Sequence, residues 1–167
     1  QGTHYISMAK FLYDSNDTFR KTVDEVDSLA KKHFDFNLVD HIYAEPGDEA
    51  VEKKLGTLVG VQISLYAVEV ALAKVLEEKG LVPEVLIGHS FGEISAMTFA
   101  GVWSVADGFQ VVKARIEAAE ESIKHAPFPL GMMSINCSEE RRDKILSLAG
   151  ENLIHTNTNA PGRYIFG

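Results

Sequence analysis

The residues best suited to do chemistry in this sequence lie at 88–92, which read Gly-His-Ser-Phe-Gly. In a G-x-S-x-G motif, small residues two before and two after the serine let the backbone turn sharply between a strand and a helix, and the serine is left exposed on the turn. We therefore predict that Ser90 is a nucleophile. We also expect a branched side chain at Gly92 to crowd the turn and the backbone packed against it.

The same five letters also arise by chance in loops, so the flanking residues decide. Residues 85–87 are Val-Leu-Ile and follow Gly80 and Pro83, which is the pattern of a strand buried on both faces of a parallel sheet. Residues 91–100 have helical apolar spacing. The positive end of that helix would point at Ser90 and favour an oxyanion there.

Length and composition fit a globular protein with one large domain or slightly more: 167 residues, 46% hydrophobic. The formal net charge of -8 argues against binding to nucleic acid or to an anionic membrane surface. Cys137 is the only cysteine, so no internal disulfide forms, and no Cys/His cluster indicates a metal site. We expect a cytoplasmic protein.

The longest apolar stretch, residues 59–75, is interrupted by polar side chains, and we predict a central, buried helix over 55–79 that does not span a membrane. Gln62 stands where a core would prefer no polar group, so it either bonds neighbouring backbone or faces the site. The other interruptions are Ser64, Glu69 and Lys74.

Two further helices are predicted from their start signals. Asn16 or Asp17 can cap a helix, and a start that resembles a capping box at 104–107 opens another. Arg115 lies one residue round from the apolar stripe of the second helix, and it is either a site residue or a surface arginine. No spacing pairs His33 or His41 with a partner, so both are expected at the surface. The two apolar stripes are Phe19, Val23, Val26 and Leu29 or Ala30, and Phe109, Val112, Ile116 and Ala119.

The pattern changes after Pro127 and Pro129, and the order strand, helix, strand, strand predicts a small second subdomain. The predicted segments are strand 132–136, helix 139–148, strand 152–158, turn 159–162 and strand 163–166.

Taken together, residues along the whole chain resemble the malonyl-CoA:acyl carrier protein transacylase family, which includes the acyltransferase domains of polyketide and fatty-acid synthases. The resemblance implies an α/β-hydrolase-like parallel-sheet core at 1–128 and the start of an inserted ferredoxin-like subdomain at 129–167, both partial, in a chain truncated at both ends. The motifs that carry it are Gln1-Gly2, Gln62, residues 88–93, Ala100-Gly101-Val102, Arg115 and residues 157–162.

The resemblance also implies roles for single residues. Ser90 would accept the acyl group, Arg115 would bind the free carboxylate of a malonyl-type group, and the backbone N–H groups of Gln1 and Phe91 would form the oxyanion hole. The other side chains expected to line the site are Gln62 and Asn159. His89 occupies a variable position of the motif and is not expected to act as the base.

The sequence departs from the family pattern in three places. The first strand, before Gln1, is missing, His4 stands where a glutamine is common, and no residue matches the catalytic histidine. His125 and His155 follow the serine but match no family motif, and we expect them in loops or at the surface. A serine is a weak nucleophile without an adjacent base, so we expect residues 1–167 alone to be nearly inactive.

The implied function is transfer of a malonyl-type acyl group from coenzyme A, through an acyl-serine, to the phosphopantetheine thiol of an acyl carrier protein. The acyl-CoA and the carrier are substrates, no cofactor is expected, and neighbouring synthase domains are expected partners. Two alternatives stay open: a serine hydrolase of the esterase or lipase type, and a non-catalytic fragment that docks a carrier.

Overall fold

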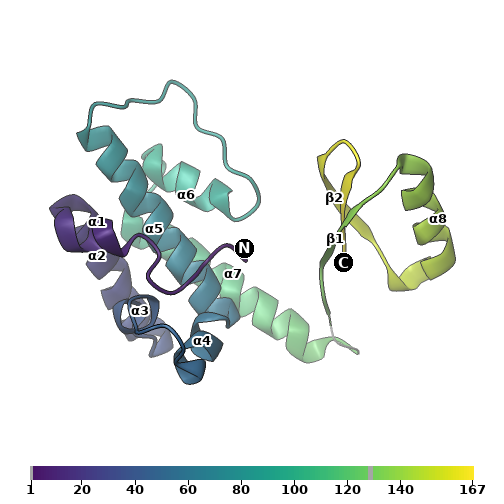
Figure 1. Cartoon of the computed structure of the whole chain (residues 1–167), viewed down its shortest axis with the longest axis horizontal. Coiled ribbons are helices and arrows are strands. Elements are labelled where there is room, and N and C mark those ends of the chain that lie inside the picture. Colours follow the sequence, from purple (N-terminus) through teal and green to yellow (C-terminus); the bar gives the residue numbers. More distant parts are fainter. Residues whose placement is uncertain (1, 128–129) are drawn as a thin grey trace. The chain divides into compact units, whose positions relative to one another are not determined.

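The computed structural model describes residues 2–127 and 130–167 of the chain and divides it into two compact units (Figure 1). The units are Gln1–Glu120 and Glu121–Gly167, and the division falls within helix α7. The domain boundary predicted between 128 and 129 lies outside the described residues. The first unit holds α1 (Lys10–Ser15), α2 (Asp17–Phe34), α3 (Leu38–Ile42), α4 (Glu49–Leu55), α5 (Leu58–Glu78), α6 (Gly92–Phe99) and most of α7 (Val105–His125).

Helices α2 and α5 form the centre of the first unit. The side chain of Asn16 accepts a hydrogen bond from the N–H of Phe19 (2.8 Å), which satisfies one of the free donors at the start of α2. The predicted stripe on α2 is confirmed, with Ala30 as its last fully buried member. Its residues, and the corresponding ones of α7, have no exposed surface: Phe19, Val23, Val26 and Ala30, and Phe109, Val112 and Ile116.

The predicted central helix is confirmed as α5, which Thr57 caps by accepting from the N–H of Gly60 (3.1 Å). The helix is long and apolar enough to cross a membrane by composition, but 61% of its most apolar window is buried inside the structure. Burial against α2, α3, α4 and α6 accounts for the apolar residues, as in the core helix of a globular protein.

The strand predicted at 85–87 is wrong for this structure. Residues 81–89 run as an extended loop from α5 to α6, outside any sheet, and Val85 and Ile87 are 74% and 89% exposed (Figure 1). A parallel strand obtains its hydrogen bonds and the cover of both faces from neighbouring strands. None of the described residues pairs with this segment, so its apolar composition alone does not make it a strand.

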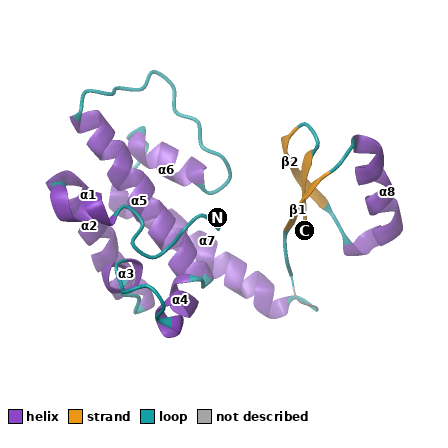
Figure 2. Cartoon of the chain, in the orientation of Figure 1, coloured by secondary structure: helices purple, strands orange, loops and turns teal. Residues whose placement is uncertain are grey.

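The second unit contains every strand that the structure describes (Figure 2). They form an antiparallel sheet in the order β1-β3-β2, in which Tyr164 of β3 lies opposite Ile135 on one side and Thr158 on the other. The predicted order of strand, helix, strand, strand is therefore confirmed. The elements are β1 (Met133–Asn136), α8 (Glu139–Ala149), the 3-10 turn η1 (Gly150–Asn152), β2 (His155–Ala160) and β3 (Arg163–Phe166).

The prediction of a solvated His41 is wrong. The His41 ring is 9% exposed and stacks on the ring of Phe36, with the ring centroids 4.7 Å apart. His33 is half-buried, and its ring lies 6.0 Å from that of Phe109. Both imidazoles therefore pack against aromatic rings of the core.

Candidate active site

Ser90 stands between the extended loop and the first turn of α6, with its side chain exposed. Its φ is 54°, in the left-handed region that residues with a Cβ seldom adopt. Such a backbone costs on the order of 1–3 kcal/mol and persists only where the surroundings enforce it. The structure therefore holds this serine in the strained, exposed conformation expected of a nucleophile elbow.

Two glycines flank this turn, and only one of them is tightly packed. A Cβ at Gly88 would lie 2.3 Å from the Cα of Glu93 and 2.4 Å from its nitrogen, so the loop crosses directly over the first turn of α6. A Cβ at Gly92 would meet nothing within 4 Å. The expectation that a side chain at Gly92 crowds the turn is wrong, and Gly88 is the position that excludes one.

The turn after Ser90 leaves one backbone donor, the N–H of Phe91, available. The N–H groups of Gly92, Glu93 and Ile94 each donate to the carbonyl three residues earlier. No backbone carbonyl of the described residues accepts from the N–H of Phe91. This donor and the positive end of α6 lie next to the serine, where negative charge would develop on an attacked thioester or ester. Gln1, the other expected donor, lies outside the described residues.

Phe91 links this turn to Arg115. The Phe91 side chain is 2% exposed and belongs to the core of the first unit. The Arg115 guanidinium carbon lies 6.0 Å from the centroid of the Phe91 ring. The structure thus brings Arg115 of α7 near the residue that follows the serine, and its carboxylate-binding role stays a prediction.

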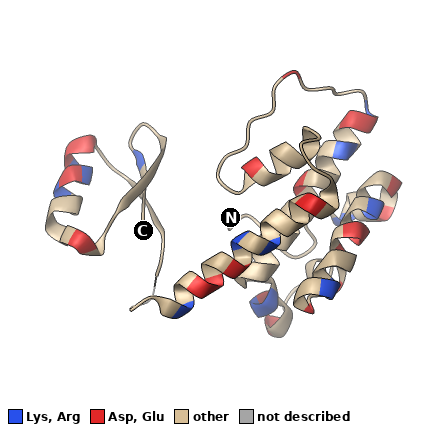
Figure 3. Ribbon diagram, turned by 180° about the vertical axis from the view of Figure 1, so that it is seen from behind, with Lys and Arg blue, Asp and Glu red and all other residues tan. Residues whose placement is uncertain are grey.

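Arg115 is exposed and takes part in none of the ion pairs found among residues 2–127 and 130–167. Its neighbour on α7, Lys113, is bound to Glu117 (2.7 Å). Figure 3 shows that α7 carries both acidic and basic residues. Because no carboxylate of the described chain occupies Arg115, its planar fork is available to an external carboxylate.

The two remaining predicted site residues lie in different units. Gln62 of α5 is 1% exposed, and its Oε1 has no hydrogen-bond partner among the described residues. A buried acceptor without a partner is costly, so this amide is suited to a donor that the described residues do not supply. Asn159 lies exposed on β2 in the second unit, where its Oδ1 accepts from Asn157 Nδ2 (2.7 Å). The binding roles of both residues stay predictions.

The two histidines downstream of the motif differ from each other. His125 ends α7, is exposed, and its Nε2 lies 2.6 Å from Glu121 Oε1. His155, expected in a loop or at the surface, lies half-buried on β2, with its ring 5.5 Å from that of Tyr164 and 5.9 Å from that of Phe166. Both histidines belong to the second unit.

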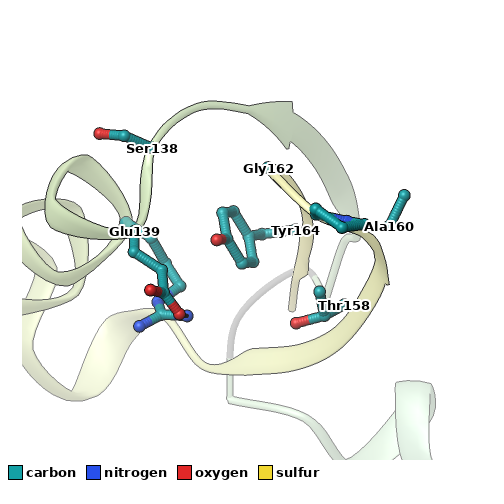
Figure 4. A pocket seen from close by; sticks show the side chains of 8 residues that line it. Ser138, Glu139, Thr158, Ala160, Gly162 and Tyr164 are labelled. Carbon is teal, nitrogen blue, oxygen red and sulfur yellow. Dashed lines mark hydrogen bonds and ion pairs between the residues drawn. The ribbon is translucent and has the colours of Figure 1, made fainter.

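The second unit has a pocket of 590 Å³ between the start of α8 and the β2–β3 turn (Figure 4). Arg142 and Tyr164 line it, and the guanidinium lies over the phenol ring at 4.9 Å. Arg142 is also bound to Asp143 (2.7 Å) and Glu139 (3.4 Å). Two carboxylates therefore compensate its charge, and the arrangement stabilises the unit without forming an anion site.

Within residues 2–127 and 130–167, no three or more His, Cys, Asp and Glu side chains are grouped so that they could hold a metal ion.

Sequence reasoning missed the polar side chains between α5 and α6. Ser95 Oγ donates to Glu69 Oε2 (2.5 Å), and the Tyr66 hydroxyl lies 3.1 Å from Thr98 Oγ1. Burial raises the pKa of Tyr66 to about 12, so its hydroxyl stays protonated near neutral pH. The signal in the sequence was Glu69, one of the polar side chains that interrupt the apolar stretch 59–75.

Comparison with known proteins shows the family of this chain. The family model described as "Acyl transferase domain" matches residues 1–146. The chain is 32% identical over 147 residues to the non-reducing polyketide synthase crz7 of Cladonia metacorallifera, which covers 88% of this chain and 7% of that protein. It is also 32% identical over 158 residues to the pikromycin polyketide synthase component PikAII of Streptomyces venezuelae, and this match covers 94% of this chain and 4% of that protein. The chain thus spans less than a tenth of the length of these relatives.

Solved structures give the same picture. The acyltransferase domain from module 8 of the salinomycin polyketide synthase is 30% identical, with a TM-score of 0.80 over 99% of this chain and 37% of that one. An acyl carrier protein S-malonyltransferase from Vibrio cholerae is 24% identical, with a TM-score of 0.75 over 99% of this chain and 52% of that one. At this level of identity, the second likeness shows similarity of the fold alone. The described chain therefore has the mixed helix and strand content of part of such a domain.

Proposed function

The chain belongs to the acyl transferase domain family, and we propose that it serves an enzyme that moves a malonyl-type acyl group from coenzyme A to an acyl carrier protein. Ser90 carries the acyl group between the two substrates. The observation that carries the proposal is the conformation of the turn: an exposed serine held at φ 54°, next to the free N–H of Phe91.

The reaction proceeds in two transfers through one covalent intermediate. In the first, a base takes the proton of Ser90 Oγ, the oxygen attacks the thioester carbon, and coenzyme A leaves as its thiol. In the second, the phosphopantetheine thiol of the carrier attacks the acyl-serine, and Ser90 recovers its proton. No histidine of the sequence matches the family motif, so we assign the base to a histidine outside residues 1–167.

The Phe91 N–H, with that of Gln1, stabilises the negative oxygen of both tetrahedral intermediates. A backbone donor of this kind contributes about 10²–10³-fold to the rate of acyl transfer. Because Ser90 and Phe91 are adjacent on one rigid turn, the nucleophile and the donor keep a fixed geometry as charge develops. Gln62 is assigned to the lining of this site, and the binding role of Asn159 stays a prediction from the family resemblance.

Arg115 selects the acyl group. Malonyl and related groups carry a free carboxylate, and a guanidinium can bind it through two parallel hydrogen bonds. Arg115 forms none of the ion pairs found among the described residues, and its guanidinium lies near the Phe91 ring, which supports this role. A neutral ester, the substrate of an esterase or lipase, would make no use of that charge.

At the level of the fold, we assign the first unit to an α/β-hydrolase-like core and the second to a ferredoxin-like subdomain. The turn at Ser90, with its left-handed φ at the start of α6, supports the first assignment, because a nucleophile elbow of this kind is typical of that fold. The sheet order β1-β3-β2 with one helix supports the second. We further propose a cytoplasmic synthase domain that requires no cofactor, a setting that suits a single free cysteine, Cys137.

The test is single-turnover labelling of the intact protein with radiolabelled malonyl-CoA. We expect one acyl group on Ser90, none on the Ser90→Ala variant, and transfer of the label to an added carrier protein faster than its release to water. Release to water at a rate that the carrier does not change would support a hydrolase. Absence of label from Ser90 would support a non-catalytic role.

A further inference from the structure

Four polar side chains join α5 to α6 in a fixed register. Tyr66 and Glu69 are three residues apart and share one face of α5, and Ser95 and Thr98 do the same on α6. Tyr66 pairs with Thr98 (3.1 Å) and Glu69 with Ser95 (2.5 Å), so the two hydrogen bonds are the steps of an antiparallel ladder. Figure 1 shows the two helices side by side.

The inner end of this ladder is closed by further hydrogen bonds. The Tyr66 hydroxyl donates to the carbonyl of Val105 (2.9 Å), so in the Tyr66–Thr98 pair the Thr98 hydroxyl is the donor; this hydroxyl also lies 2.9 Å from the Ile94 carbonyl. Trp103 Nε1 donates to Thr98 Oγ1 (2.7 Å). Gly108 packs directly on these atoms, since a Cβ there would lie 2.3 Å from the Tyr66 oxygen and 2.4 Å from Thr98 Oγ1. A buried polar network that is fully satisfied specifies one arrangement of its helices.

Apolar packing alone would not define this register. Phe91 and Ile94 bury α6 in the core, but hydrophobic burial has no direction and tolerates sliding along the helix axis. Hydrogen bonds weaken steeply with distance and angle, so the ladder sets both the height and the rotation of α6. This explains why Glu69 interrupts an apolar helix.

The position of α6 sets the position of the nucleophile. Ser90 and Phe91 directly precede the helix, and Glu93 in its first turn packs on Gly88. Any axial shift of α6 therefore moves the serine oxygen and the Phe91 N–H by the same distance. A displacement of about 1 Å can reduce a rate about 10²-fold.

We propose that Tyr66 and Glu69 are positioning residues that hold α6 in register and thereby place Ser90 for acyl transfer. The inference rests on the proposed function of Ser90. It assigns a role to side chains that themselves contact neither the acyl group nor the serine, and it predicts losses in the acylation step and not in substrate affinity.

The experiment compares three variants of the intact protein by single-turnover acylation with malonyl-CoA, by KM, and by melting temperature. Tyr66→Phe removes the hydroxyl and keeps the ring. Glu69→Leu removes the acceptor, and Glu69→Gln keeps an amide oxygen in its place. We expect the first two to slow acylation about tenfold or more with KM unchanged, in keeping with a displacement of a fraction of an ångström. Glu69→Gln should keep most of the acylation rate of the parent.

Tyr13→Phe is the matched control. The Tyr13 hydroxyl donates to Asp24 (2.7 Å) between α1 and α2, so this variant also loses one hydrogen bond of the first unit. We expect it to lower the melting temperature by a similar amount and to leave the acylation rate unchanged. Ser95→Ala removes the donor of the Glu69 bond with little change of volume, and it replaces Glu69→Leu if that variant does not fold.

Acylation of Tyr66→Phe at the parent rate, or a loss in Tyr13→Phe equal to that in Tyr66→Phe, would overturn the positioning role and leave the proposed function intact. A parent protein that is not acylated on Ser90 would instead overturn the proposed function, and the positioning role with it.

Discussion

A side chain at Gly88 should displace the nucleophile, and the structure gives the size of the displacement. In Gly88→Ala the new Cβ would stand 2.3 Å from the Cα of Glu93, whereas ordinary contacts begin at 3.4 Å. The first turn of α6 and the loop must therefore separate by about 1 Å, a misplacement that can cost about 10²-fold in rate. Overpacking of this kind also destabilises a fold by about 1–3 kcal/mol.

Gly92→Ala is the matched control, because the two glycines flank the same serine. A Cβ at Gly92 meets nothing within 4 Å, and its φ is not in the left-handed region. Alanine in a helix is more stable than glycine by about 0.5–1 kcal/mol. We therefore expect Gly92→Ala to keep or raise the melting temperature and to leave acylation unchanged.

The assay is the second-order rate at which a fluorophosphonate labels Ser90 in the intact protein, measured well below the melting temperature of each variant. Thermal unfolding followed by circular dichroism gives the stability separately. Labelling of Gly88→Ala at the parent rate would refute the tight turn, and so would an equal loss in Gly92→Ala.

Three further outcomes are expected. Arg115→Ala should slow malonyl transfer by about one to two orders of magnitude, since hydrogen bonds to charged groups contribute about 1.5–3 kcal/mol, and it should leave acetyl transfer unchanged. Competition between malonyl-CoA and acetyl-CoA measures the ratio of the two transfer rates, and a ratio equal to that of the parent would remove Arg115 from the site. Burial raises the pKa of Tyr66 from 10.0 to about 12, so the contribution of the Tyr66 hydroxyl to stability is complete below pH 10 and is lost as the pH rises through 12. The free energy of unfolding should therefore fall between pH 10 and pH 12, and it should fall less steeply in Tyr66→Phe. Asn16→Ala should lower the free energy of unfolding by about 1 kcal/mol through loss of the α2 cap, with Ser90 labelling as the readout that must not change.

Some features of this protein follow from the sequence by itself. The helices α2, α5 and α7 are set by apolar residues at helical spacing and by capping side chains, which act within a few residues of one another. The Ser90 turn belongs to the same class, because glycine at 88 and a helix start at 92 are local properties. The strand and helix order of the second unit was predictable for the same reason, from turn residues between short apolar runs.

Other features depend on neighbours that the sequence does not name. Residues 85–87 have the composition of a buried strand, yet they remain an exposed loop where no strand pairs with them, because sheet hydrogen bonds are supplied by a partner. Gly88 and Gly92 look equivalent in the motif, and only the crossing of the loop over Glu93 distinguishes them. His41 is buried by Phe36, although its sequence surroundings are polar.

The candidate site divides in the same way. The motif identifies Ser90, but the contact between Arg115 and Phe91 joins residues 24 positions apart, and it arises only in the folded first unit. The ladder from Tyr66 and Glu69 to α6 spans about thirty residues and leaves no periodic trace, because a polar side chain in an apolar helix signals only that some partner exists. Local spacing therefore predicted which residue is the nucleophile, and only tertiary packing decided which side chains lie around it, since hydrogen-bond partners distant in the chain are chosen by the fold.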